Sequence, residues 1–78
     1  MPRYYFDLRD DRGLFPDEEG LELPTIDAAR AEAAQALADM LRDAVQDDSR
    51  TLHLSIEVRN DVGRVLHLKS SFEIETLV

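Results

Sequence analysis

The hydrophobic pattern of the N-terminal segment alternates with a period of two. In residues 3–9 the apolar side chains share one face and the polar ones share the other, which is typical of a half-buried β-strand. The apolar members are Tyr4, Phe6 and Leu8. Residues 10–13 supply turn chemistry, and Leu14 and Phe15 start a return strand. Pro16 cannot donate a hydrogen bond to a ladder, so we expect this strand to be short, bulged or at a sheet edge.

The longest periodic segment spans residues 26–46 and predicts an amphipathic helix of about five turns. Its apolar positions recur at helical spacing: Ile26, Ala29, Ala33, Leu37, Met40, Leu41 and Ala44. Thr25 precedes the helix, and its hydroxyl can accept a hydrogen bond from a backbone N–H of the first turn, as an N-cap does. Residues 17–20 indicate a bend, and residues 21–23 are extended up to Pro24.

Two more strands are expected after the helix, following a polar connection at residues 46–51. In residues 52–59 apolar and polar side chains alternate without a break, which is the clearest strand pattern in the chain. Residues 60–63 form a turn, and residues 65–68 form the return strand. Beyond residue 68 two outcomes stay open, a continued strand or an irregular tail.

The register of this second hairpin follows from the parity of its loop. A two-residue loop would set Ile56 against His67 and so mix apolar and polar side chains on one face. A three-residue loop with Gly63 in the left-handed conformation sets Ile56 against Leu68. We expect the three-residue loop, because it alone keeps the apolar side chains together.

The element order is therefore strand, strand, helix, strand, strand. It predicts an α+β fold in which one antiparallel sheet of about four strands has the helix packed on one face, ββαββ. The 78 residues suffice for a single domain, residues 1–78. The second face of the sheet should be polar. A core of this size gives marginal stability without disulfides, and the chain has no cysteine, so a homodimer is expected.

Charge narrows the range of partners. Nine basic residues against 17 acidic ones give a net charge of −8, which repels nucleic-acid phosphates and anionic membrane surfaces. No apolar run approaches the roughly 18 residues that cross a bilayer, and the first residues do not resemble a signal peptide. We therefore expect a cytoplasmic protein that binds neither nucleic acid nor membrane.

An acidic run, Asp17, Glu18 and Glu19, admits three interpretations: a solvated bend, a contact with a basic partner, or a cation site. We favour the solvated bend and keep the partner contact as the alternative. The oxygen-ligand spacing of a calcium loop is absent, so no metal is expected.

His53 and His67 are the only histidines. In the register chosen above both point to the helix-free face, with His67 opposite Glu57 and His53 opposite Ser71. At about 3.3 Å of rise per residue the two imidazoles lie too far apart to share one metal ion. We expect a cross-strand surface pair between Glu57 and His67 rather than a catalytic one.

Motifs for catalysis and for cofactors are missing. The chain has no cysteine and three glycines, and it contains neither a glycine-framed serine nor a phosphate-binding glycine loop. We expect no enzymatic activity and no cofactor. The aromatic residues of the first hairpin are candidates for a protein contact, because Tyr5, and with it Phe15, should lie on the face away from the helix. For Tyr5 two interpretations stay open, a protein contact and a half-buried side chain that only fills space.

The opening MPRYYF, the DEEG followed by LELP, the alanine-rich AARAEA and the late SIEVRNDVGRVL resemble a family of short bacterial proteins classed as a domain of unknown function. The resemblance runs from Met1 to about Phe72. It implies the same single-domain architecture and no particular activity. The chain also resembles HicB-type antitoxin domains, whose helix opens with a threonine and an acidic, alanine-containing first turn, as in residues 25–29. Those proteins neutralise a small basic ribonuclease toxin, which an acidic chain would suit.

The sequence therefore predicts a small acidic protein-interaction module, with an antitoxin-like neutraliser as the alternative. The candidate partner contacts are Tyr5, Phe15, Asp17, Glu18 and Glu19.

Overall fold

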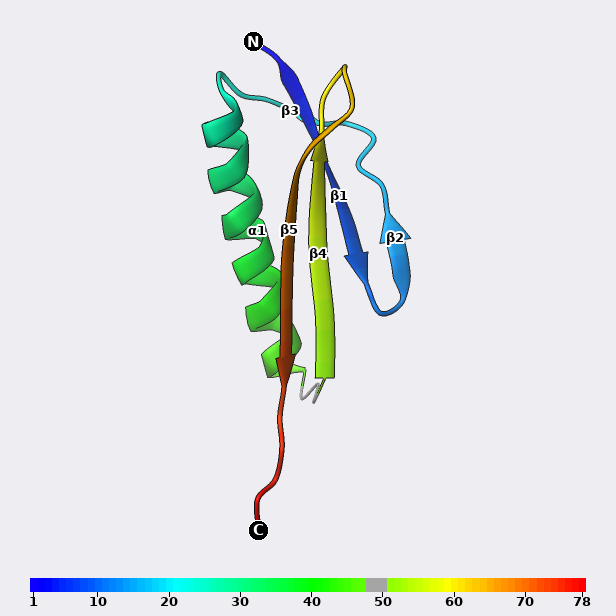
Figure 1. Ribbon diagram of the computed structural model, residues 1–78, viewed down its shortest axis with the longest axis vertical. Coiled ribbons are helices and arrows are strands. Elements are labelled where there is room, and N and C mark those ends of the chain that lie inside the picture. Colours follow the sequence, from blue (N-terminus) through cyan, green and yellow to red (C-terminus); the bar gives the residue numbers. More distant parts are fainter. Residues whose placement is uncertain (48–50) are drawn as a thin grey trace.

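One antiparallel sheet and one helix make up the described part of the chain, residues 1–47 and 51–78 of the computed structural model (Figure 1). The elements in chain order are β1 (Arg3–Asp10), β2 (Gly13–Phe15), β3 (Leu21–Glu22), α1 (Ile26–Gln46), β4 (Thr51–Arg59) and β5 (Arg64–Glu73). The α+β prediction is confirmed. The residues expected to be merely extended before Pro24 contribute a further short strand, β3, while Asp48, Ser49 and Arg50 of the polar connection lie outside the described residues.

The strand order across the sheet is β2-β1-β4-β5, and β3 pairs with β1 beside β2. Every pairing is antiparallel. The strands that border the helix in sequence, β3 and β4, do not pair with each other, since β4 lies against the opposite edge of β1. The chain therefore returns through α1 to place β4 in the middle of the sheet.

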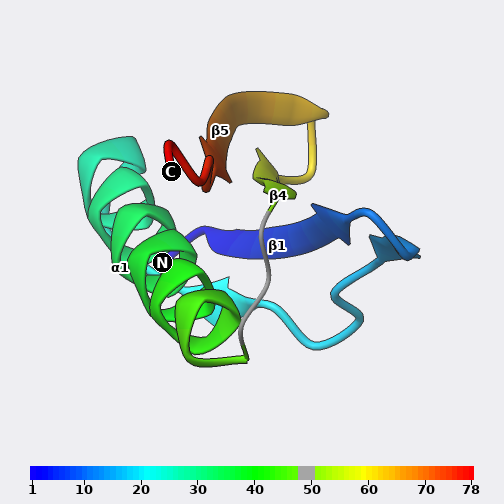
Figure 2. The ribbon, with the colours of Figure 1, turned by 90° about the horizontal axis from the view of Figure 1, so that it is seen from below.

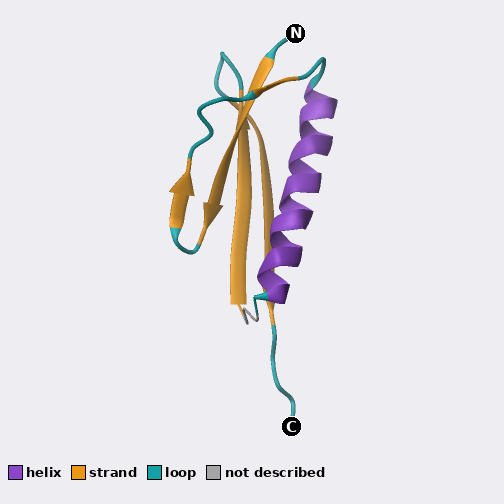
Figure 3. Ribbon diagram, turned by 180° about the vertical axis from the view of Figure 1, so that it is seen from behind, coloured by secondary structure: helices purple, strands orange, loops and turns teal. Residues whose placement is uncertain are grey.

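Helix α1 covers one face of the sheet and leaves the other face open (Figures 2 and 3). The core lies between them. Its most buried members are Tyr4, Ala29, Ala33, Leu54, Ile56 and Val58. Ala29 and Ala33 are fully buried at the helix surface, because a methyl side chain lets the helix axis approach the strands closely. Ile56 and Val58 are the largest side chains with no exposure among the described residues.

The helix begins and ends where its hydrophobic period predicts. Thr25 is the N-cap, and its Oγ1 accepts a hydrogen bond of 3.1 Å from the backbone N–H of Ala28. Asp27 lies in the first turn, where the helix dipole favours a negative charge. Among the described residues, α1 lacks the continuous hydrophobic stretch that a membrane-spanning helix requires.

The register of the second hairpin is confirmed: Val58 faces Leu66 and Ile56 faces Leu68. The loop itself differs from the expected three residues. Arg59 pairs with Arg64 while Val58 pairs with Leu66, so Val65 is an extra residue, and this bulge supplies the change of parity. Gly63 has a φ of +149°, which is positive but outside the narrow left-handed helical region.

The turn before the bulge is closed by an asparagine. The Oδ1 atom of Asn60 accepts hydrogen bonds from the backbone N–H groups of Val62 (2.9 Å) and Gly63 (3.2 Å). This is the Asx geometry that favours asparagine at the start of turns. Strand β5 then continues to Glu73, which settles the open question about the residues after 68.

The first hairpin is short, as Pro16 requires. Leu8 pairs with Phe15 and Asp10 pairs with Gly13, so β2 holds only three residues at the sheet edge. The prediction that Phe15 lies on the helix-free face is wrong. Residues directly opposite in an antiparallel pair share a face, and Leu8 points to the helix side. Phe15 keeps 48% of its surface exposed because it lies at the edge of the sheet.

Candidate functional site

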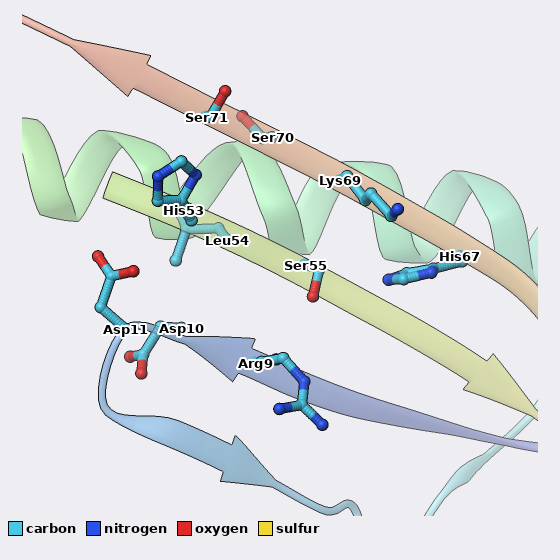
Figure 4. Close-up of a pocket in the computed structure, with 10 residues that line it drawn as sticks. All are labelled: Arg9, Asp10, Asp11, His53, Leu54, Ser55, His67, Lys69, Ser70 and Ser71. Carbon is cyan, nitrogen blue, oxygen red and sulfur yellow. The ribbon is translucent and has the colours of Figure 1, made fainter. Parts of the chain in front are cut away.

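The open face of the sheet carries a shallow polar hollow of about 550 Å³ that crosses β1, β4 and β5 (Figure 4). The face is polar because successive side chains of each strand point to opposite faces of the sheet. The residues between the core positions therefore point away from α1. The residues that line the hollow are Arg9, Asp10, Asp11, His53, Leu54, Ser55, His67, Lys69, Ser70 and Ser71.

Both histidines lie at this hollow, on the helix-free face as expected. His67 pairs with Glu57 and His53 pairs with Ser71. Four residues along β4 separate the two rows, which is about 13 Å at 3.3 Å per residue. In Figure 4 the two imidazoles lie well apart, with Ser55 and Lys69 between them. Within the described residues no group of three or more histidine, aspartate or glutamate side chains could hold a metal ion.

A second polar cluster joins three distant segments of the chain. The guanidinium of Arg59 donates to Asp7 Oδ2 through Nε at 2.8 Å and to the backbone carbonyl of Asp17 through Nη2 at 2.9 Å. The backbone N–H of Asp17 donates to Asp7 Oδ1 at 2.9 Å. Asp7 is 9% exposed, and Arg59 compensates its buried charge. The hydrogen bond with Asp7 and the charge of that carboxylate raise the pKa of Arg59 above its ordinary value.

Asp17 occupies a gap in the sheet edge. β1 pairs with β3 at one end and with β2 at the other, and between them the backbone N–H of Phe6 donates to Asp17 Oδ2 at 3.1 Å. Asp17 Oδ1 also accepts from the backbone N–H groups of Glu19 (3.1 Å) and Gly20 (3.2 Å). Its carboxylate therefore takes the place of a ladder partner for β1 and holds the bend in shape.

The electrostatics of Asp17 follow from these contacts. Desolvation raises the pKa of Asp17, but the N–H donors of Phe6, Gly20 and Glu19 and the charge of Arg59 outweigh it, so the pKa lies below its ordinary value. The expectation of a wholly solvated bend is wrong for Asp17, which is partly buried, while Glu18 and Glu19 have exposed side chains.

Tyr5 lies on the helix-free face as predicted, and it is partly buried. The guanidinium carbon of Arg59 lies 4.5 Å from the centre of the Tyr5 ring, a cation–π contact. The same ring approaches Gly20, where a Cβ atom would meet Tyr5 Cε1 at 2.9 Å and Arg3 Cγ at 2.9 Å. Glycine is required at residue 20 for that reason and because its φ is +72°.

Asp10 closes the first turn. Its Oδ1 accepts from the backbone N–H of Arg12 at 2.7 Å, and its Oδ2 pairs with the guanidinium of Arg12 at 2.9 Å. The side-chain hydrogen bond from Arg12, followed by the backbone one, lowers the pKa of Asp10. The same guanidinium lies 5.9 Å from the ring of Phe15. Arg12 thus contacts Asp10 at the end of β1 and Phe15 at the end of β2.

The structure separates the five candidate contact residues into two roles. Tyr5 and Asp17 stabilise the fold around Arg59, whereas Phe15, Glu18 and Glu19 are exposed at one edge of the sheet. Sequence reasoning missed Arg9 and Lys69, which line the hollow from β1 and β5. Their strand parity placed both on the open face, but only the pairing of β1 with β4 brings them to the same place.

A comparison with protein families matches residues 3–72 of this chain to a domain of unknown function (DUF6894). The matched residues begin with the first residue of β1 and end within β5, so they include the whole sheet and the helix. Comparisons with curated proteins and with solved structures gave no match.

Proposed function

The chain belongs to the DUF6894 family, a domain of unknown function, and from this premise we propose that it is a non-enzymatic interaction module that pairs with a second copy of itself through the free edge of β5. The observation that supports this proposal is the unpaired edge of β5. β5 pairs with β4 on one side, and no described strand pairs with its other side. A long unpaired edge is a template for strand addition, because its backbone N–H and C=O groups are already aligned.

The length of β5 distinguishes this edge from the opposite one. β5 has ten residues, whereas β2 has three and β3 has two. The opposite edge is also closed by the Asp17 carboxylate, which accepts the Phe6 N–H. Strand addition is therefore favoured at β5.

An apolar groove beside this edge supports the same partner. α1 and β5 border a groove of about 450 Å³, lined by Ala34, Leu37, Ala38, Leu41, Leu68, Lys69 and Ser70. On the helix the stripe continues at spacings of three and four residues, and its members are Ala31, Ala34, Ala38, Leu41 and Val45. Val45 is 53% exposed. Small side chains would let a second helix approach closely when a second β5 pairs with the first.

The exposed area of the chain is consistent with a missing partner. The chain exposes 5648 Å², whereas a monomer of its 8.9 kDa mass exposes roughly 4,800 Å². The difference is close to the roughly 800 Å² that each partner contributes to a typical interface. Part of it belongs to the tail after β5, which lies outside the strands.

The side chains of β5 favour one register. If the two strands centre on Ser70, Leu68 lies opposite Phe72 of the second copy on the helix side, and His67 lies opposite Glu73 of the second copy on the open face. Centring on Lys69 would place two lysines directly opposite each other, which like charges disfavour. The small Ser70 at the centre leaves room for the two helices.

The test is the mass of the particle in solution, measured by sedimentation equilibrium over a range of protein concentrations. We expect twice the 8.9 kDa chain mass at high concentration. Ala38→Lys places a charge in the helix stripe and should give a monomer. Gln46→Lys adds the same charge at the last residue of α1, on a different side of the helix, and should leave the dimer intact. A monomeric wild type, or equal effects of the two variants, contradicts the proposal.

A second candidate function is supported by the charge. An antitoxin-like neutraliser of a small basic ribonuclease would use the −8 net charge, and three of the four exposed acidic residues of α1 gather on one of its sides. These residues are Glu32, Asp39 and Asp43. Inhibition of a basic ribonuclease encoded beside this chain would support that role, and the absence of such a neighbouring gene would count against it.

A further inference from the structure

Two basic side chains lack an acidic partner among the described residues. The chain has nine lysines and arginines, and Arg50 lies outside the described residues, which leaves eight. Six of these form ion pairs with carboxylates: Arg3, Arg12, Arg30, Arg42, Arg59 and Arg64. Arg9 and Lys69 form none. Both side chains are exposed and therefore accessible to a ligand.

The two unpaired cations belong to one row across the sheet. Arg9 on β1 pairs with Ser55 on β4, and Ser55 pairs with Lys69 on β5. All three side chains point away from the helix. Neighbouring strands lie about 4.8 Å apart, so the Cα atoms of Arg9 and Lys69 are separated by about 10 Å with the serine between them. Figure 4 shows the Ser55 hydroxyl between the two cationic side chains.

Further donors border this row inside the same hollow. His53 and Ser71 form the next row on one side. The row on the other side is Asp7, Glu57 and His67, of which His67 lines the hollow. The hollow of about 550 Å³ lies in the size range of small-molecule sites, roughly 300–1,000 Å³. Guanidinium, ammonium, hydroxyl and imidazole groups therefore all face one concave surface.

The acidic groups nearby leave the row largely uncompensated. Each of three neighbouring carboxylates is paired with another arginine: Asp7 with Arg59 at 2.8 Å, Asp10 with Arg12 at 2.9 Å and Glu57 with Arg64 at 3.5 Å. Asp11 lines one end of the hollow, next to His53 in Figure 4 rather than between the two cations. Two positive charges fixed on one surface repel each other, and a bound anion removes that repulsion.

We propose that the row Arg9, Ser55 and Lys69 binds the phosphate group of a small phosphomonoester. A phosphate group presents three terminal oxygens, so a guanidinium, a hydroxyl and an ammonium can each find a separate acceptor. A carboxylate has only two oxygens and would leave one of the three donors without its own acceptor atom. A long polyanion is disfavoured, because the surrounding net charge of −8 repels every phosphate beyond the hollow. This inference does not rest on the dimer.

The test is a titration of the full-length protein with inorganic phosphate, followed by amide chemical shifts in NMR spectra at constant ionic strength. We expect saturable shifts centred on the amides of Arg9, Ser55 and Lys69. Arg9→Gln and Lys69→Gln should each weaken the apparent affinity by about tenfold or more, as loss of a charged donor does. Both side chains are exposed, so circular dichroism should confirm that the variants fold.

The matched control is Arg30→Gln, which removes the same charge from the exposed surface of α1, where Arg30 pairs with Asp27. It should leave the affinity for phosphate unchanged. Parallel titrations with acetate and with a single-stranded oligonucleotide separate the sources of the anion. Absence of saturation, an equal loss in Arg30→Gln, or tighter binding of either alternative ligand would overturn the assignment.

Discussion

The carboxylate of Asp17 should be among the most important polar groups for the stability of this fold. It accepts hydrogen bonds from the backbone N–H groups of Phe6 (3.1 Å), Glu19 (3.1 Å) and Gly20 (3.2 Å). In Asp17→Asn one oxygen becomes an NH₂ group, which faces at least one of these donors and cannot accept from it. Hydrogen bonds to charged groups contribute about 1.5–3 kcal/mol, and an unpaired buried donor costs about 1–3 kcal/mol.

We therefore expect Asp17→Asn to lower the free energy of unfolding by about 2–4 kcal/mol. A chain of 78 residues has a total of only about 4–12 kcal/mol. The assay is urea denaturation followed by circular dichroism. With a slope of about 1 kcal/mol per molar urea, the midpoint should fall by about 2 M or more. Protein concentration must be the same in all samples, because the proposed dimer would stabilise the folded state in a concentration-dependent way.

The matched control is Glu18→Gln. It removes the same charge from the neighbouring residue, whose side chain is exposed and forms no hydrogen bond or ion pair within the described chain. Its free energy of unfolding should stay within about 0.5 kcal/mol of the wild type. Equal small effects of the two substitutions would refute the reasoning, because net charge and not the hydrogen bonds would then set the stability.

Three further outcomes are expected. The pKa of Asp17 is lowered in the folded state, so the Asp17 carboxylate contributes its full stabilisation above the ordinary pKa of 3.8. This stabilisation is lost as the pH falls through the folded-state pKa. The free energy of unfolding should therefore decline less steeply with acid in Asp17→Asn than in the wild type. Gly20→Ala should destabilise the protein by more than about 1 kcal/mol in thermal melts, since its φ is +72° and the new Cβ would lie 2.9 Å from Tyr5 Cε1. Ile56→Ala should cost about 2–5 kcal/mol, whereas Val62→Ala, at a residue that is 93% exposed, should change urea stability by less than about 0.5 kcal/mol.

Local patterns were sufficient to predict the helix and the register of the second hairpin. The period of the apolar residues and the Thr25 cap define α1, since both act within a few residues of chain. Parity alone also predicted the register of β4 and β5, because a slip of one residue would expose Ile56 and Val58. The bulge at Val65 was not predictable, since an odd loop and an even loop with a bulge give the same register.

The sequence does not reveal which strands pair when they lie far apart in the chain. β1 and β4 are neighbours in the sheet, and Asp7 and Arg59 meet across 52 residues of chain. The hydrogen-bonding role of Asp17 could therefore not be predicted from its acidic run. Glu18 and Glu19 are exposed, as a solvated bend predicts. Phe15 was assigned to the wrong face because the register of the first hairpin was unknown. Predicting that Arg9 and Lys69 lie in one row requires two strand pairings, β1 with β4 and β4 with β5.

Cross-linking within a dimer tests the proposed pairing of β5 most directly. The chain has no cysteine, so a single Ser70→Cys substitution introduces one thiol at the centre of the proposed pair. Residues directly opposite in antiparallel strands have Cα atoms about 4.5–5.5 Å apart, within the range of a disulfide. Mild oxidation of the native protein should convert Ser70→Cys to a covalent dimer, while Ser55→Cys, in the middle of the sheet on β4, should stay monomeric under denaturing electrophoresis. Equal cross-linking of both variants, or none at Ser70, would contradict the pairing.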